Sequence, residues 1–112
     1  MKVAIVGSRD FMFPEMVISY IRTLPKDTII VSGGARGVDT WAEKTAKELG
    51  MQTEIYPAQW DKFGLSAGII RNNDIVKAAD KVVAFWNGRS KGTLHTIKLA
   101  KLYDKLDAIF NE

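Results

Sequence analysis

The sequence predicts an α/β fold in which helices cover both faces of a parallel β-sheet. Short apolar segments alternate with helical patterns along the whole 112-residue chain. The apolar segments are hydrophobic at nearly every position, whereas hydrophobic and polar residues would alternate in a half-exposed strand. Strands of that kind are buried on both faces, as in parallel sheets between layers of helices. We expect right-handed crossovers and the order β-α-β-α-β-α-β-α-β.

Glycine and proline divide the first half of the chain. Pro14 is typical of a first helical turn, where a missing N–H is tolerated, and Pro25 follows the end of that helix. Gly50 is a typical stop after a helix, and Pro57 ends the next apolar run. We therefore predict strands at residues 2–6, 28–32 and 52–56, and helices at about residues 14–24 and 39–49.

The second half begins with an aromatic, irregular segment at residues 57–64. A helical pattern, a buried apolar run and a polar loop at residues 87–92 follow it. We predict a helix at about residues 66–79, a strand at 81–86, a helix at about 93–103 and a short final strand at 106–110.

Length and composition exclude several classes of protein. The chain fits one domain, residues 1–112, and its 46% of hydrophobic residues can build a core. Without cysteine and with His95 as its one histidine, it offers neither disulfides nor a clustered metal site, and we expect no metal and no cofactor. The first apolar run is too short for a signal peptide, and no run approaches the ~20 residues of a membrane span. We expect a cytoplasmic protein without membrane partners.

The arginines are distributed unevenly along the chain. The net charge of +3 is weak evidence for nucleic-acid binding. Four of the five arginines, however, fall in or beside predicted loops and helix starts, whereas most lysines fall on predicted helix surfaces. The guanidinium group suits two-pronged contacts with phosphate or carboxylate. The four arginines are Arg9, Arg36, Arg71 and Arg89.

Three strand-to-helix loops combine glycine with arginine, at residues 7–10, 32–39 and 87–93. In parallel sheets ligands bind at the carboxyl edge of the strands. Glycine lets backbone N–H groups approach an anion, and a helix N-terminus follows each loop. One such loop alone is better explained as a turn, but three at one edge favour an anion site. Their spacing fits neither GxGxxG nor a P-loop.

The expected ligand-binding residues belong to these loops and to the helix at residues 66–79. Ser8 and Ser32 are either turn residues or hydrogen-bond donors to phosphate. Asn72 should be partly buried and bound to the backbone of a neighbouring loop, while Arg71 points about 100° away from it, toward the sheet edge or solvent. The full set is Gly7, Ser8, Arg9, Ser32, Gly33, Gly34, Arg36, Gly37, Arg71, Asn72, Arg89, Ser90, Gly92 and Thr93.

Asp39 and Glu43 are the candidate catalytic carboxylates, spaced i and i+4 on one helical face. Helix N-capping alone would explain Asp39, and pairing with Lys47 or with the helix dipole would explain Glu43. The functional alternative is a carboxylate that holds a ribose hydroxyl or acts as a general base.

Two aromatic residues and one histidine have open interpretations. Trp60 and Phe63 can stack on a base, cover the site, pack in the core or form dimer contacts. His95 is either a surface residue or a ligand contact. Trp86 is expected in the core. We expect a homodimer, because a chain this small carries several tryptophans and aromatic loop residues.

The segments that carry these residues resemble the SLOG superfamily, specifically its YspA/cpYpsA-related branch. The matching segments cover most of the chain in the expected order: VGSRDF, VSGGARGVDTWAE, YPAQWDKFGLSAGIIRNNDIV and DKVVAFWNGRSKGTLHTIKLA. The resemblance implies a Rossmann-like three-layer fold with the strand order 3-2-1-4-5 and a nucleotide-type ligand.

Two more distant resemblances point to different functions. VSGGARGVD is similar to the SGLARGID loop of the DNA-processing protein DprA, and the Arg71-Asn72 pair with the later GT loop is similar to Lonely Guy phosphoribohydrolases. Lonely Guy enzymes use that arginine together with a glutamate shortly after PGGxGT. Here His95 and Thr96 stand where the acidic residues belong, so the likeness does not extend to the catalytic acid.

Three functions follow from the sequence. The first is binding of a nucleotide or nucleotide-derived small molecule, for sensing or for a hydrolytic step. The second is DprA-like nucleic-acid binding, which the modest charge makes less favoured. The third is a plain interaction module.

Overall fold

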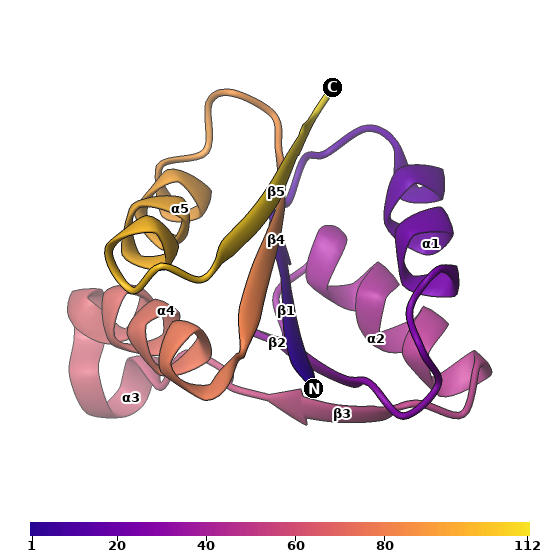
Figure 1. The fold of residues 1–112 in the computed structure, drawn as a ribbon. Coiled ribbons are helices and arrows are strands. Elements are labelled where there is room, and N and C mark those ends of the chain that lie inside the picture. The colour runs from indigo at the N-terminus through magenta and orange to yellow at the C-terminus, as the bar shows by residue number, and fades with distance from the viewer.

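The computed structural model describes residues 1–112 and contains a parallel five-stranded sheet in the order β3-β2-β1-β4-β5 (Figure 1). The predicted fold class and strand order are confirmed. The strands are β1 (Lys2–Gly7), β2 (Ile29–Ser32), β3 (Gln52–Ile55), β4 (Lys81–Trp86) and β5 (Leu106–Asn111). The helices are α1 (Pro14–Arg22), α2 (Val38–Glu48), α3 (Trp60–Phe63), α4 (Ala67–Ala78) and α5 (Lys91–Leu102), with a 3₁₀ turn, η1, at Gly64–Ser66.

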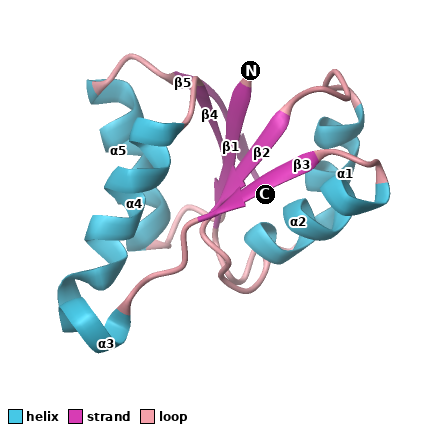
Figure 2. Ribbon diagram, turned by 90° about the horizontal axis from the view of Figure 1, so that it is seen from below, coloured by secondary structure: helices cyan, strands magenta, loops and turns pink.

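Helices form a layer on each face of the sheet (Figures 1 and 2). The α1 and α2 helices cover one face, and α4 and α5 cover the other. Side chains of β1 divide between the two interfaces, because successive residues of a strand point to opposite faces. Val3 and Ile5 belong to the core under α1 and α2, while Ala4 and Val6 belong to the core under α4 and α5.

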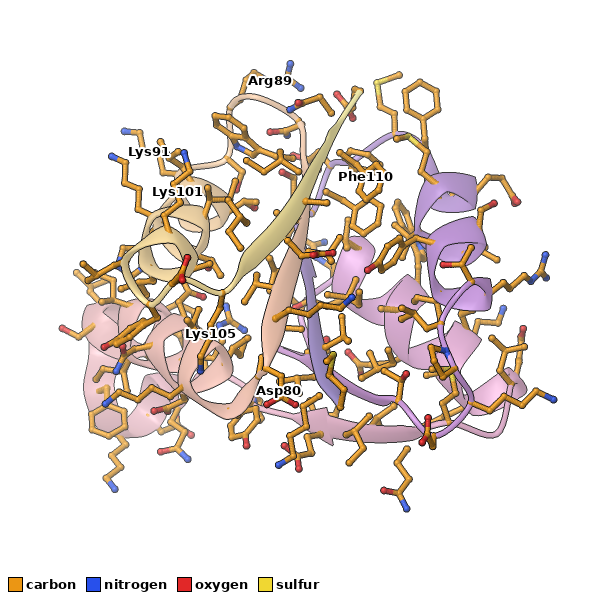
Figure 3. All side chains as sticks on the ribbon, in the orientation of Figure 1. Asp80, Arg89, Lys91, Lys101, Lys105 and Phe110 are labelled. Carbon is orange, nitrogen blue, oxygen red and sulfur yellow. The ribbon has the colours of Figure 1, made fainter.

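An aromatic cluster fastens α1 to the β4–β5 side of the sheet. Phe85 of β4 stacks on Phe110 of β5, with ring centroids 5.0 Å apart, and Phe11 meets Phe85 edge-on at 5.8 Å. The Phe110 ring lies on the α1 side of β5 (Figure 3), and the Tyr20 ring of α1 is 5.6 Å from it. Aromatic pairs in these geometries stabilise a core beyond the area they bury.

The edge strands differ from the prediction that all strands are buried on both faces. In β5, partly buried and exposed residues alternate, and the two end residues of β3 are exposed. Each edge strand has one hydrogen-bonded neighbour and incomplete cover from the helices. Continuous burial is a property of the inner strands; in β1 and β4 the four middle residues are buried.

Helix boundaries shift where local capping decides them. The α5 helix begins at Lys91, two residues before the prediction, because Ser90 is its N-cap and the Ser90 Oγ accepts a hydrogen bond from the Thr93 N–H. The α2 helix begins after Gly37, whose φ of 77° favours glycine. Asp39 lies inside that helix, so its predicted role as N-cap is wrong. The segment predicted as irregular contains α3 and the first residue of η1.

The C-terminus of α4 is capped from the start of β5. The Lys105 Nζ donates hydrogen bonds to the carbonyl oxygens of Val76, at 2.8 Å, and Lys77, at 3.2 Å. A cation in this position also complements the negative end of the helix dipole. None of the helices has the length and hydrophobicity needed to span a bilayer.

Candidate functional site

A cavity of about 700 Å³ opens beyond the carboxyl ends of β1 and β4. We call it the main pocket. These strands are neighbours, and the chain leaves them toward opposite sides of the sheet, which is where ligands bind in open α/β folds. The loop after β1, the loop after β4, the α4 helix and the start of α2 form its walls. Its volume is in the range of small-molecule sites.

Arg71 is the fixed cation of the main pocket. Its Nη1 donates to the Gly33 carbonyl oxygen at 2.8 Å, and its Nε donates to Asn72 Oδ1 at 3.1 Å. The guanidinium is partly buried, and this desolvation lowers the pKa of Arg71; the charge of Asp39 opposes the shift, and the charge of Arg9 adds to it. No carboxylate lies within 4 Å of Arg71 or Arg9. The pocket therefore contains a desolvated positive charge with donors to spare.

Gly33 gives the Arg71 side chain the space that it occupies. A Cβ at Gly33 would overlap Arg71 Nη1 and would lie 3.0 Å from Asp39 Oδ2. Glycine at this position therefore leaves room for the Arg71 guanidinium; it is not required by a positive φ. Its functional contribution is indirect, because Gly33 does not line the main pocket.

Asp39 is the buried carboxylate of the main pocket, with 6% of its surface exposed. Its Oδ2 accepts a hydrogen bond from the Ala35 N–H at 3.2 Å. Burial raises the pKa of Asp39 from its ordinary 3.8 to about 6, although the Ala35 N–H and the charge of Arg71 act in the opposite direction. Near neutral pH this carboxylate is ionised but poorly solvated, so a hydroxyl donor from a ligand would stabilise it.

Asn72 connects Arg71 to His95. Its Oδ1 accepts from Arg71, so its Nδ2 must face the other way, where His95 Nδ1 lies at 3.2 Å and the Gly92 carbonyl oxygen at 3.4 Å. The amide can only donate to His95 Nδ1, which leaves Nε2 as the ring nitrogen available to a ligand. Asn72 is buried and bound to a neighbouring backbone, as predicted.

Hydroxyl groups tie the loop after β1 to the start of α5. Thr93 Oγ1 lies 3.0 Å from Ser90 Oγ and 3.4 Å from Ser8 Oγ, and Ser8 Oγ accepts from the Asn87 N–H at 3.1 Å. Ser8 and Thr93 are buried. The Ser8 hydroxyl thus organises the base of the pocket.

A second, smaller cavity of about 290 Å³ adjoins the main pocket over the ends of β2 and β3. We call it the side pocket. Its walls come from the loop after β2 and from residues 57–60. The positive charges along the two pockets come from five side chains, of which Arg89 and Lys91 lie at the end of the molecule opposite Asp80 (Figure 3). The five are Arg9, Arg36, Arg71, Arg89 and Lys91.

The structure gathers most, but not all, of the sequence-predicted residues at one site. Gly7, Arg9, Asp39, Arg71, Asn72, Arg89, Ser90, Gly92 and Thr93 line the main pocket. Gly33, Gly34 and Arg36 line the side pocket. Ser8, Ser32, Gly37 and Glu43 line neither.

The residues outside the pockets have structural partners. The Ser32 Oγ donates to Glu43 Oε2 at 3.0 Å, below the loop, and no ion pair joins Glu43 to Lys47. A Cβ at Gly37 would lie 2.5 Å from the Arg9 carbonyl oxygen, so this glycine lets the first two loops pack together. Glycine and serine in such loops are consistent with both roles, and the sequence does not separate them.

Several lining residues were not among the predicted site residues. Asn87, Lys91 and Thr96 line the main pocket, together with His95 and Trp60, whose roles were left open. Lys91 and Asn87 flank the predicted arginine loop, a signal that was available. Leu65 and Ile69, which also line the main pocket, gave no signal, because Leu65 falls between the predicted elements and Ile69 has the pattern of an ordinary helix residue.

One protein family and one relative from a phage match much of the chain. The YspA, cpYpsA-related SLOG family matches residues 1–63. The Gene 61 protein of Mycobacterium phage D29 is 37% identical over 83 residues, which are 69% of this chain and 66% of the phage protein.

Two solved structures share the fold. DNA processing protein A (DprA) from Streptococcus pneumoniae superposes with a TM-score of 0.79 at 27% identity, over 96% of this chain and 49% of that one. DNA processing protein A from Helicobacter pylori, studied for its single-stranded DNA binding mode, gives a TM-score of 0.74 at 23% identity, over 96% of this chain and 64% of that one. The chain thus spans about half to two thirds of the proteins it matches.

Proposed function

The chain belongs to the YspA, cpYpsA-related SLOG family, and we propose that its main pocket binds a nucleotide or a nucleotide-derived small molecule. One observation carries the proposal. Arg71 is a partly desolvated cation at the point where the strand order reverses, with two N–H groups committed to protein oxygens and no carboxylate within 4 Å. Asp39 acts on Arg71 only from beyond ion-pair distance, and a phosphate would supply the anion in direct contact that Arg71 lacks.

The other groups of the pocket suit the remaining parts of a nucleotide. Arg9 lies close enough to share the phosphate, and the N-terminus of α5 offers backbone N–H groups at Lys91 and Gly92. The Asp39 carboxylate is placed to accept hydrogen bonds from ribose hydroxyls. His95 Nε2 supplies a further polar contact.

Binding without turnover is the favoured form of this function. Glu43, predicted as a catalytic carboxylate, lies outside both pockets and is held by Ser32. The start of α5 places His95 and Thr96 where Lonely Guy enzymes carry acidic residues. Asp39 is then a ligand-holding group, and a sensing role follows.

Binding of single-stranded DNA is the second candidate. The row of cations from Arg36 through Arg9 and Arg71 to Arg89 and Lys91 suits a phosphodiester backbone. The fold of a DprA protein with a described single-stranded DNA binding mode also favours it. Such binding would weaken steeply with salt, whereas a nucleotide held by one buried arginine would depend on salt less.

A thermal-shift titration with AMP and ADP-ribose tests the first candidate. A ligand at a hundredfold excess over its Kd adds about 2.7 kcal/mol of stability, which raises the melting temperature by several degrees. Arg71→Ala should abolish the shift, whereas Arg22→Ala, an exposed arginine of α1, should keep it. Equal shifts in the two variants, or no shift in the folded wild type, would overturn the proposal.

A further inference from the structure

The two pockets meet at a shared wall that contains both arginines of the anion site. Arg9, Ala35, Trp60 and Arg71 line the main pocket and the side pocket alike. We propose that the ligand has two arms joined through phosphate: a nucleoside in the main pocket, phosphate against Arg9 and Arg71, and a second, sugar-sized group in the side pocket. This inference rests on the proposed function and adds the class of ligand.

Charge places the phosphate at the junction. Arg71 is held from both sides, by the Gly33 carbonyl oxygen and by Asn72 Oδ1, so its guanidinium stays between the pockets. Arg9 is exposed and reaches both cavities. Neither arginine has an acidic partner within 4 Å. A phosphate neutralised at this wall would have one substituent directed into each pocket.

The sizes of the two pockets indicate which arm of the ligand each one holds. The main pocket, at about 700 Å³, has room for the larger nucleoside, and it holds the buried Asp39 carboxylate for ribose hydroxyls. The side pocket, at about 290 Å³, suits a smaller group. Five of its nine lining residues are glycine, alanine or proline, and the others are Trp60 and three arginines, whose guanidinium groups can donate hydrogen bonds to sugar hydroxyls.

Trp60 forms a platform beside the junction. The residue is 52% exposed, and its ring packs against α4, since a Cβ at Gly68 would lie 3.5 Å from the Trp60 Cη2. The long connection from β3 brings α3 under α4 at this end of the molecule (Figure 2). An indole fixed on one side and open on the other offers a stacking face to a base or a sugar ring.

Two sources carry this chemistry: a small molecule such as ADP-ribose, and a nucleotide of a DNA strand together with the deoxyribose of the next residue. Calorimetry should compare ADP with ADP-ribose, and dAMP with its phosphodiester to an abasic deoxyribose, because each pair differs by the second arm. We expect the two-armed member of at least one pair to bind about tenfold more tightly. The pair that shows the gain identifies the source.

Variants in the side pocket test whether the higher affinity of the two-armed ligand comes from that cavity. Ala58→Phe fills the side pocket, and Ala58→Ser leaves it open. Ala58→Phe should remove the tenfold gain in affinity of the two-armed ligand, while the affinity for ADP or dAMP changes less than about twofold. Arg36→Ala, an exposed change in the same cavity, should reduce the gain even if the phenylalanine impairs folding.

The failures are distinguishable. One-armed ligands that bind as tightly as two-armed ones would overturn this inference and leave the proposed function intact. The inference would also be overturned if Ala58→Phe, in a folded protein, lowered the affinity for both ligands of a pair equally. Absence of binding by every nucleotide, with the protein folded, would remove the proposed function together with the inference.

Discussion

Substitution of Asp39 by asparagine should stabilise the protein at neutral pH and have little effect in mild acid. The carboxylate is buried, and its pKa is raised from 3.8 to about 6. Folding therefore favours the protonated form. The stability associated with Asp39 is present in acid and is lost as the pH rises from about 4 through 6. Asparagine keeps the shape and an oxygen for the Ala35 N–H, but it carries no charge.

The size of the effect follows from the two pKa values. Linkage gives a loss of about 3 kcal/mol at pH 7, and about 0.5 kcal/mol at pH 4, relative to an uncharged side chain. Asp39→Asn should then raise the urea midpoint at pH 7 by on the order of 1 M and change it little at pH 4.

Urea unfolding at several values between pH 4 and pH 8 measures this difference. Asp61→Asn, an exposed carboxylate in α3, is the matched control and should show no comparable rise. A gain for Asp39→Asn that is equal at pH 4 and pH 7 would refute the reasoning, because it would exclude ionisation as its source. So would a loss of stability at pH 7. A gain confined to neutral pH indicates that Asp39 is kept at the expense of stability.

Further predictions concern the pocket, the α4 cap and assembly. Gly33→Ala should displace Arg71 and weaken nucleotide binding at least about tenfold. The fold should tolerate Gly92→Ala, because nothing lies within 4 Å of the new methyl group. Equal nucleotide binding by the wild type and Gly33→Ala would contradict the role of Gly33. Lys105→Met should lower the free energy of unfolding by about 1 kcal/mol through the lost α4 cap, and an unchanged urea midpoint would show that the cap contributes nothing. The homodimer stays a prediction, and light scattering that detects only monomer at micromolar concentration would remove it.

The fold followed from the sequence because its signals are local and repeated. Buried runs, glycine stops and proline positions each mark an element, and five strands joined by helices leave few alternatives. The short α3 helix was missed because four residues carry no period. The edge strands were predicted as too deeply buried, since hydrophobicity alone does not show which strands lack a neighbour.

The site was predictable at the level of loops but not of contacts. Glycine and arginine in three loops located the pocket, because topology brings the carboxyl ends of parallel strands to one edge. No pattern of residues indicates that Gly33 makes room for Arg71, because the two are 38 positions apart in the chain. The i, i+4 spacing on one helix made Asp39 and Glu43 equivalent candidates for a catalytic carboxylate. Their surroundings differ, because Asp39 lines the main pocket, whereas Glu43 accepts a hydrogen bond from Ser32 outside it.

The position of a bound phosphate tests the anion site most directly. Crystals of the protein grown with AMP should show phosphate oxygens within about 3 Å of the Arg71 guanidinium, with the nucleoside in the main pocket. Arg71 should still donate to the Gly33 carbonyl oxygen in that complex. A phosphate bound elsewhere, with Arg71 contacting only protein and water, would contradict the assignment of Arg71 as the residue that holds the anion.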